Sequence, residues 1–236
     1  MSSRQERRAQ ARGKSNAGGP KKRDPMTAIY IGFAIAIVAV LLIFTLFNLK
    51  QRHDYAAAYA TPTPGPNATV SPIPLKDGVA IGKTVLKDGD VFGGGFGSPV
   101  DGIQCEAEMA TFHVHTHLAL FVNGKQIAVP RYTGFAPNGA GGGCLYWLHT
   151  HSQDGIIHVE TPGVHDFTLG NFFHVWGASL SHTAIATFHG PVTAYVNGMK
   201  YDGDLAAIPL GAHQQITLEV GTPLVAPPNY SFPPGD

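Results

Sequence analysis

The sequence predicts a mostly β domain, a sandwich or barrel with one short helix, behind a single N-terminal transmembrane helix. Several segments alternate apolar and polar residues or are rich in β-branched and aromatic residues, which is typical of strands. The 29 glycines and 18 prolines, with only 14% charged residues, argue against coiled coils and large helical bundles. A long uncharged apolar run stands near the N-terminus, so we expect the β domain to follow a membrane anchor.

The first 25 residues are a predicted basic cytoplasmic tail. Residues 1–24 contain eight basic and two acidic side chains, a net charge of +6. Residues 26–49 carry no charged side chain, and a helix of this length, at about 1.5 Å per residue, can cross a hydrocarbon core of roughly 30 Å. The run is too long for a signal peptide, so we predict an uncleaved, single-pass anchor. The basic excess before the span places the later residues on the extracellular or periplasmic side of the cell membrane.

Residues 50–75 are predicted to be a Pro-rich spacer, because prolines keep the segment extended and few large apolar side chains are available for burial. The domain at 76–236 has six Lys and Arg against 13 Asp and Glu, a net charge of −7. An acidic domain is a poor partner for nucleic acid and a plausible one for cations. We therefore predict the lipid bilayer and a metal ion as partners, and no nucleic acid.

Seven segments of the domain are predicted strands. They are residues 79–85, 110–122, 125–129, 156–161, 184–188, 192–196 and 215–220. Asn123-Gly124 and Asn197-Gly198 each separate two such segments, which is the strongest short-range signal for a hairpin turn.

One short helix is predicted after Gly170. Asn171 is the expected N-cap, and Phe173, Trp176 and Leu180 follow at the three- and four-residue spacing of a buried helix face. It is the only helix that the sequence predicts in residues 76–236.

Two pairs of segments share a residue frame. They are ATFHVHTHLALFVNG (110–124) with ATFHGPVTAYVNG (186–198), and LHTHSQDGIIHVETP (148–162) with LGAHQQITLEVGTP (210–223). We interpret them as an internal duplication with halves at about 105–165 and 184–225. The first copy holds six histidines, whereas the second keeps only His189 and His213 at matching places. Histidines added to one copy of a repeated frame indicate a site built on a scaffold.

The first histidine group lies on the predicted strand 110–122. Because side chains alternate along a strand, His113, His115 and His117 share one face, and an apolar stripe occupies the other. Residues two apart are separated by about 6.6 Å and residues four apart by about 13 Å. We therefore expect at most one adjacent pair of these histidines to bind a given ion.

The second group, WLHTHSQDGIIHVE, offers two histidines on one predicted strand and a histidine and a glutamate after a predicted turn at Asp154-Gly155. Two HxH pairs from neighbouring strands would supply three or four imidazoles, enough for a closed tetrahedral site or for one with a bound water. The predicted metal ligands are His115, His117, His149 and His151, with His113 and His158 as alternates.

Copper or zinc is the expected ion, because neutral imidazole suits both and affinity among divalent first-row ions peaks at copper. The main hypothesis is a membrane-anchored extracytoplasmic protein that handles or delivers this metal, with a membrane oxidase or another metalloprotein as partner. A three-ligand site with an open position would instead activate water or dioxygen, as in a hydratase, hydrolase or oxygenase, with Glu160, Glu106 or Glu108 as proton acceptor. A third hypothesis is a non-catalytic interaction or pH-sensing module, because imidazole titrates near 6.5.

The chain has two cysteines, Cys105 and Cys144. Outside the cytoplasm such a pair is most simply a disulfide, which would close a loop of about 40 residues and stabilise the domain by about 3–4 kcal/mol. The alternative is a thiolate metal site, since each cysteine lies near a His-rich segment. Met109, just before the first histidine group, is a candidate soft ligand.

Five motifs follow one another over roughly residues 100–236. They are HxHxHLALFVNG, CLYWLHTH, GIIHVE, FTLGNFFHVWG and VNGMKYDGD. In this order they resemble a family of membrane-anchored, His-rich bacterial and archaeal proteins of uncharacterised function. The resemblance implies a shared site at His113, His115, His117, His149, His151 and His158. Cupins are more distantly similar, because they also place HxH on a barrel strand before a glutamate, but Glu160 follows His151 by nine residues, longer than the usual cupin spacing.

Overall fold

The computed structural model describes residues 25–58, 71–76, 78–89, 95–108, 111–137 and 143–234. The chain divides into two units, residues 1–50 and residues 51–236. Residues 1–24 of the predicted basic tail, residues 59–70 of the predicted spacer and the candidate ligand Met109 lie outside the described residues.

Helix α2 (Pro25–Ala58) contains the apolar run and forms one continuous helix of 34 residues. Its stretch Ala28–His53 is long and apolar enough to cross a membrane, and a signal sequence would share these properties. The helix continues past residue 49 into the predicted spacer. No proline or glycine occurs between residues 50 and 58, and alanines at 56–58 favour helix, so nothing local stops it earlier.

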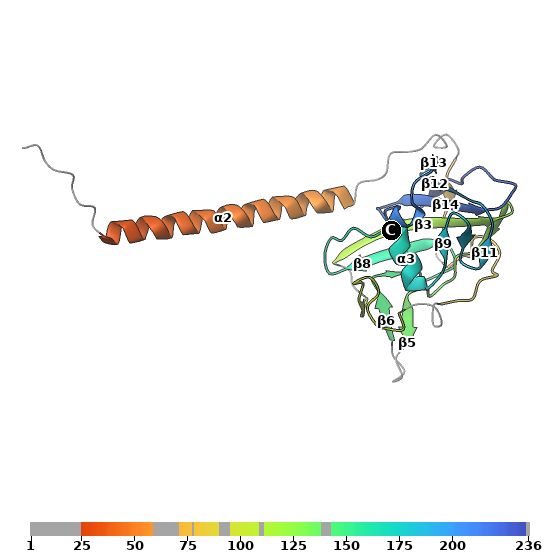
Figure 1. The fold of residues 1–236 in the computed structure, drawn as a ribbon, viewed down its shortest axis with the longest axis horizontal. Helices are drawn as coiled ribbons and strands as arrows, with labels where there is room; N and C mark the ends of the chain where they lie inside the picture. Colours follow the sequence, from red (N-terminus) through yellow and green to blue (C-terminus); the bar gives the residue numbers. More distant parts are fainter. Residues whose placement is uncertain are drawn as a thin grey trace, which may run out of the picture. The chain divides into compact units, whose positions relative to one another are not determined.

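The domain is built on one seven-stranded sheet (Figure 1). Its strands are β3 (Phe112–Val122), β4 (Lys125–Ile127), β7 (Leu148–His149), β8 (Ile156–Thr161), β12 (Val192–Val196), β13 (Met199–Tyr201) and β14 (Gln214–Val220). The order is β13-β12-β14-β3-β8-β7, with β4 also paired to β3. Among the described strand pairs of this sheet, β3 and β14 are the one parallel pair. Within the described residues the sheet stays open, so the mostly β prediction is confirmed, whereas the predicted sandwich or barrel is not.

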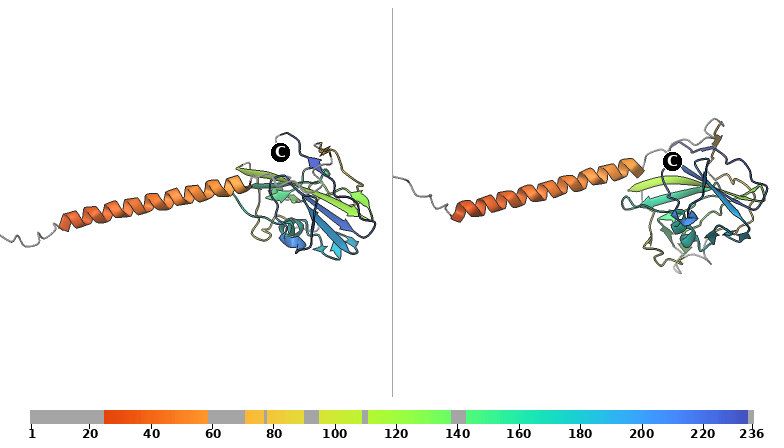
Figure 2. Two further views of the ribbon diagram at one scale, coloured as in Figure 1. Left: turned by 90° about the horizontal axis from the view of Figure 1, so that it is seen from above. Right: turned by 45° about the horizontal axis from the view of Figure 1, so that its top comes forward.

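Short elements surround this sheet. They are β1 (Ile73–Pro74) with β15 (Tyr230–Ser231), β2 (Cys105–Glu106) with β6 (Gly143–Tyr146) and β5 (Phe135–Pro137), β9 (Leu180–Ser181) with β10 (Ala184–Ile185) and β11 (Phe188–His189), the helix α3 (Leu169–Trp176) and the 3-10 turn η3 (Leu205–Ala207). The twisted main sheet and α3 beside it can be followed from two further directions in Figure 2.

The long strand β3 separates two hydrophobic clusters, as its alternation predicts. Phe112, Val114, Leu118 and Leu120 belong to the main core, together with the buried residues of α3. On the opposite face, Ala119 belongs to a smaller hydrophobic cluster. That cluster also includes the residue that directly follows β1 and the first residue of β15. The histidines of β3 lie on this second face, just beyond the smaller cluster.

Both predicted hairpin turns are present, between β3 and β4 and between β12 and β13. Asn123 and Gly124 have φ of 48° and 73°, and Asn197 and Gly198 have φ of 51° and 77°, the left-handed values that a type I′ turn requires. Each hairpin is followed by a strand that pairs antiparallel with its first strand, β8 with β3 and β14 with β12. This connectivity fits a duplication, which itself stays a prediction.

Helix α3 starts earlier than predicted. Its N-cap is Thr168, whose hydroxyl accepts from the Asn171 N–H while the Asn171 side chain accepts from the Thr168 N–H. This capping box makes Asn171 the third helical residue and not the cap. Gly177 ends the helix with φ of 71°, so Leu180 lies in β9 and not on the helix.

Two predicted strands differ in the structure. Residues 79–85 contain no strand beyond one bridge from Lys83 to Ile127, because Gly82 at φ 97° interrupts the extended backbone. Residues 184–188 are divided between β10 and β11, because Ala186 adopts φ of 50° and turns the chain.

Cys105 and Cys144 form a disulfide, so the thiolate alternative does not hold in this structure. The bond joins β2 to β6, which leads directly into β7. It closes a loop with a sequence separation of 39 residues.

Replacing both cysteines with serine is expected to lower the unfolding free energy by about 3–4 kcal/mol, because the unfolded chain regains the entropy of the open loop. Urea unfolding of the full chain in detergent, followed by tryptophan fluorescence, measures this change. Both tryptophans of the chain, Trp147 and Trp176, lie in the domain and report only on it. An unchanged midpoint, with and without reductant, would contradict the expectation.

Candidate metal centre

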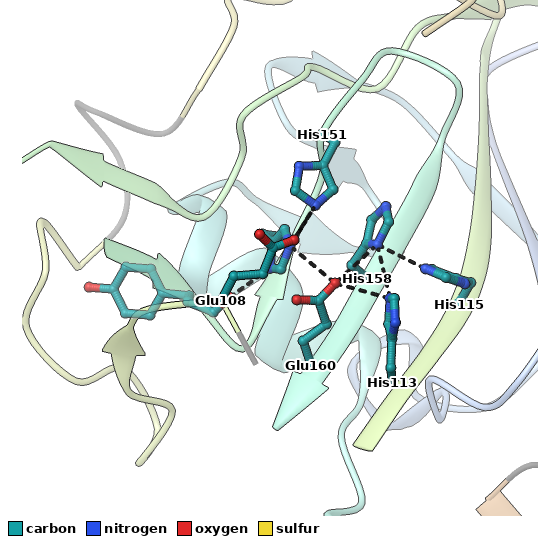
Figure 3. A network of polar contacts seen from close by, with 8 residues as sticks. Glu108, His113, His115, His151, His158 and Glu160 are labelled. Carbon is teal, nitrogen blue, oxygen red and sulfur yellow. Dashed lines mark hydrogen bonds and ion pairs between the residues drawn. The ribbon is translucent and has the colours of Figure 1, made fainter. Parts of the chain in front are cut away.

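The pairing of three neighbouring strands places the clustered histidines in rows across the sheet. His115 of β3 lies opposite His158 of β8, which in turn lies opposite His149 of β7. In the next row, His113 lies opposite Glu160. Directly opposite residues point to the same face with their Cβ atoms about 4.5–5.5 Å apart, so these side chains converge. Figure 3 shows the labelled side chains pointing toward one another.

Four donor atoms gather at the β3–β8 boundary. The Nδ1 atom of His158 lies 2.8 Å from Nε2 of His115 and 3.5 Å from Nε2 of His113. The Oε1 atom of Glu160 lies 3.0 Å from Nε2 of His113 and 3.4 Å from Nδ1 of His158. The rings of His113 and His115 have centroids only 4.4 Å apart, closer than the spacing along the strand, because both lean toward His158.

A second set of donors lies on the β7 side. The Nε2 atoms of His149 and His151 are 3.1 Å apart, and Nε2 of His149 lies 3.8 Å from Oε1 of Glu160. His151 also faces the exposed carboxylate of Glu108 at 3.6 Å. Nδ1 of His149 contacts the backbone carbonyl of Tyr146 at 2.8 Å. Because a carbonyl only accepts, Nδ1 carries the hydrogen, and Nε2 presents its lone pair to the cluster.

These residues form two overlapping groups whose donor atoms all lie within 4.8 Å of one another. One group is His149, His151, His158 and Glu160, and the other is His113, His115 and His158. We call the six residues together the histidine cluster. Burial differs within it, because His115, His149 and Glu160 are buried while His113 and His151 are each 38% exposed. The cluster is therefore closed from beneath and reachable from the side of its two exposed imidazoles.

Burial changes the proton affinity of the cluster. It lowers the pKa of His115 and of His149 to about 3, and it lowers the pKa of His158 further, with repulsion from neighbouring imidazoles adding to each effect. These three imidazoles are therefore neutral at pH 7, the form that binds metal ions. Burial also raises the pKa of Glu160 to about 7, and the nearby charge of Glu108 adds to this.

His117, predicted as a ligand, lies outside the histidine cluster. It faces Ile156 and not a donor on β8, its Nε2 contacts the carbonyl of Asp154 at 2.9 Å, and its ring packs on Tyr230. A Cβ at Gly155, where φ is 85°, would come within 2.8 Å of Nε2 of His117. The imidazole thus fits tightly into the turn before β8. Both predicted alternates, His113 and His158, belong to the histidine cluster, whereas His117 does not.

The other candidate acids and one unpredicted aromatic residue border the cluster. Glu106 is outside it, with its carboxylate accepting from the Trp147 indole at 3.1 Å. Phe135 of β5 packs edge-on against His149 and His151, with ring centroids 5.6 and 5.5 Å away. It also lines a pocket of about 450 Å³. No sequence pattern links β5 to the histidines, so only the fold reveals this apolar wall.

No protein-family model matches the chain, and neither the curated proteins nor the solved structures contain a significantly similar one. The similarities to a family of membrane-anchored His-rich proteins and to cupins therefore stay predictions. The geometry of the histidine cluster carries the functional argument alone.

Proposed function

We propose that this chain is a membrane-anchored, extracytoplasmic protein that binds copper or zinc through the histidine cluster and hands the metal to a partner. One observation carries the proposal: five imidazoles and one carboxylate, from three adjacent strands and the segment that follows β7, converge in two groups, each with its donor atoms within 4.8 Å. Five imidazoles seldom gather in one place as a folding device, because burying neutral polar groups without full hydrogen bonding costs free energy.

The donor set argues for the identity of the ion. Imidazole and carboxylate suit zinc and copper(II), while a soft thiolate site is ruled out by the disulfide. In a tetrahedral site with metal–nitrogen bonds of about 2.0–2.1 Å, two ligand atoms are about 3.3 Å apart. The neighbouring donor atoms of the cluster are 2.8 to 3.8 Å apart, a range that includes this value.

The location outside the cytoplasm rests on two features. Disulfides persist in oxidising compartments, and this domain contains one. A basic N-terminal tail before an apolar helix orients such a helix with its N-terminus in the cytoplasm. A membrane oxidase or another metalloprotein would then receive the metal at the membrane surface.

Exchange of metal requires an accessible side, and the partial exposure of His113 and His151 supplies one. A pH-sensing module is a weaker candidate, because the most buried imidazoles have pKa values lowered to about 3 and stay neutral near pH 6.5.

A metal-dependent hydratase, hydrolase or oxygenase is the second candidate function, favoured by Glu160. The pKa of this carboxyl is raised to about 7, which suits a proton acceptor at neutral pH. The adjacent apolar pocket, lined by Phe135, Tyr132 and Leu145 among others, would hold a small substrate.

Titration of the metal-free full chain in detergent with zinc or copper(II), against a chelator of known affinity, tests metal binding. We expect dissociation constants below 1 µM, and at least tenfold weaker binding after His115→Ala or His149→Ala. His182→Ala, at an exposed histidine outside the cluster, is the matched control and should bind as the unaltered chain does. Affinity no better than micromolar, or equal affinity in all variants, would contradict the proposal.

A further inference from the structure

We infer that the histidine cluster holds two metal ions, bridged by the carboxylate of Glu160. This inference rests on the proposed metal binding and specifies its stoichiometry. One ion would be held by His113, His115 and His158 on the β3 side, and the other by His149 and His151 on the β7 side.

The number and grouping of donors exceed what one tetrahedral ion uses. A four-coordinate ion takes four donor atoms, whereas the cluster offers six residues. His113 and His115 share no close group with His149 and His151, and only His158 belongs to both groups. A single ion would therefore leave at least two converging imidazoles unused.

Glu160 is placed to serve both ions. Its Oε1 atom lies 3.0 Å from Nε2 of His113 on one side and 3.8 Å from Nε2 of His149 on the other. Its Oε2 atom is buried and has no hydrogen-bond partner among the described residues. A carboxylate that is 4% exposed and leaves one oxygen unsatisfied is costly unless a cation takes that oxygen.

Two cations close together also need negative charge between them and beside them. Glu160 supplies the first carboxylate, and Glu108 lies 3.6 Å from His151 at the exposed side. Paired ions in proteins are typically about 3.5–4 Å apart. A carboxylate on β8 that bridges an ion on the β3 side and an ion on the β7 side is compatible with that separation, because adjacent strands lie about 4.7–4.9 Å apart.

The inference is tested by counting metal in the full chain in detergent, by native mass spectrometry and by elemental analysis after removal of free zinc. We expect two zinc ions per chain, and one after either His113→Ala or His151→Ala, each of which touches only one group. The His182→Ala control should keep two. A count of one in the unaltered chain overturns the two-ion site and leaves the proposed function standing, while a count of zero overturns both.

Copper(II) provides an independent readout. Two copper(II) ions sharing a carboxylate should couple magnetically, which weakens the ordinary electron paramagnetic resonance signal per copper and adds a half-field transition. In the His151→Ala chain the half-field transition should disappear and the remaining copper should give a full isolated signal. Two copper ions per unaltered chain with full, isolated signals would contradict the bridge.

Discussion

Replacing Glu160 with glutamine is expected to weaken zinc or copper(II) binding more than 100-fold while the metal-free domain stays at least as stable at pH 8. The amide keeps the size of the side chain. It also keeps an oxygen that can accept from Nε2 of His113, which lies 3.0 Å from the Glu160 carboxylate in the unaltered chain. It removes the only buried negative charge of the cluster. Since burial raises the pKa of Glu160 to about 7, ionising this carboxyl opposes folding at pH 8, and glutamine removes that opposition.

Glu219 provides a matched control. It is a buried carboxyl of β14 whose Oε1 also has no hydrogen-bond partner among the described residues, and burial raises its pKa too. It is not a member of the histidine cluster. Glu219→Gln should therefore affect stability in the same direction and leave metal affinity unchanged. Chelator competition and urea unfolding of both variants measure the two effects, and equal metal affinity in the Glu160→Gln and Glu219→Gln chains would refute the role given to Glu160.

The metal-free domain is expected to lose most of its stability between pH 7 and pH 5. His115, His149 and His117 have pKa values lowered to about 3, about 3 and about 4, and that of His158 is lowered as well. The unfolded chain therefore binds more protons than the folded one below about pH 6.5. The free energy of unfolding consequently decreases as the pH is lowered. Each such imidazole contributes about 2 kcal/mol of this loss at pH 5.

Glu160 acts in the opposite direction. Its raised pKa means that the folded state binds more protons than the unfolded state between about pH 4.5 and 7. Acidification over this range therefore increases the contribution of Glu160 to the stability of the folded state. One carboxyl offsets about one imidazole, and the net effect of these four histidines remains destabilising. Urea unfolding of the metal-free chain at pH 8, 7, 6 and 5 measures the slope. In the His117→Gln chain, the slope of the unfolding free energy against pH should be smaller by the equivalent of about one bound proton. Constant stability over this pH range would mean that these imidazoles are not buried in their neutral form.

Much of the fold could be predicted because local signals agreed with the final packing. The alternation of β3 set which residues enter the core, and two Asn-Gly pairs set the hairpins. The capping of α3 was misplaced because both Thr168 and Asn171 are good cap residues, and only the reciprocal hydrogen bonds decide between them. The open sheet could not be predicted, since alternation is the same in sandwiches, barrels and open sheets.

The sequence names all five histidines of the cluster as ligands or alternates, but it also names His117, which lies outside the cluster. The sequence places His113, His115 and His117 on one face, and a shift of the β3–β8 register by two residues preserves that face. In one register His117 would lie opposite His158, whereas in the structure His115 does. The connection from β3 to β8 is long, so no tight turn fixes the register. In the observed register Gly155 packs against β3, and its carbonyl accepts a hydrogen bond from the Leu118 N–H at 2.8 Å.

X-ray absorption at the zinc K-edge, on the zinc-loaded full chain in detergent, tests most directly whether this histidine cluster binds metal through imidazole. The geometry predicts about four nitrogen or oxygen neighbours at about 2.0–2.1 Å and the outer-shell scattering of two to three imidazoles per zinc. It predicts no sulfur neighbour at about 2.3 Å, because both cysteines are in the disulfide. A shell of oxygen atoms without imidazole scattering, or a sulfur neighbour, would contradict the account.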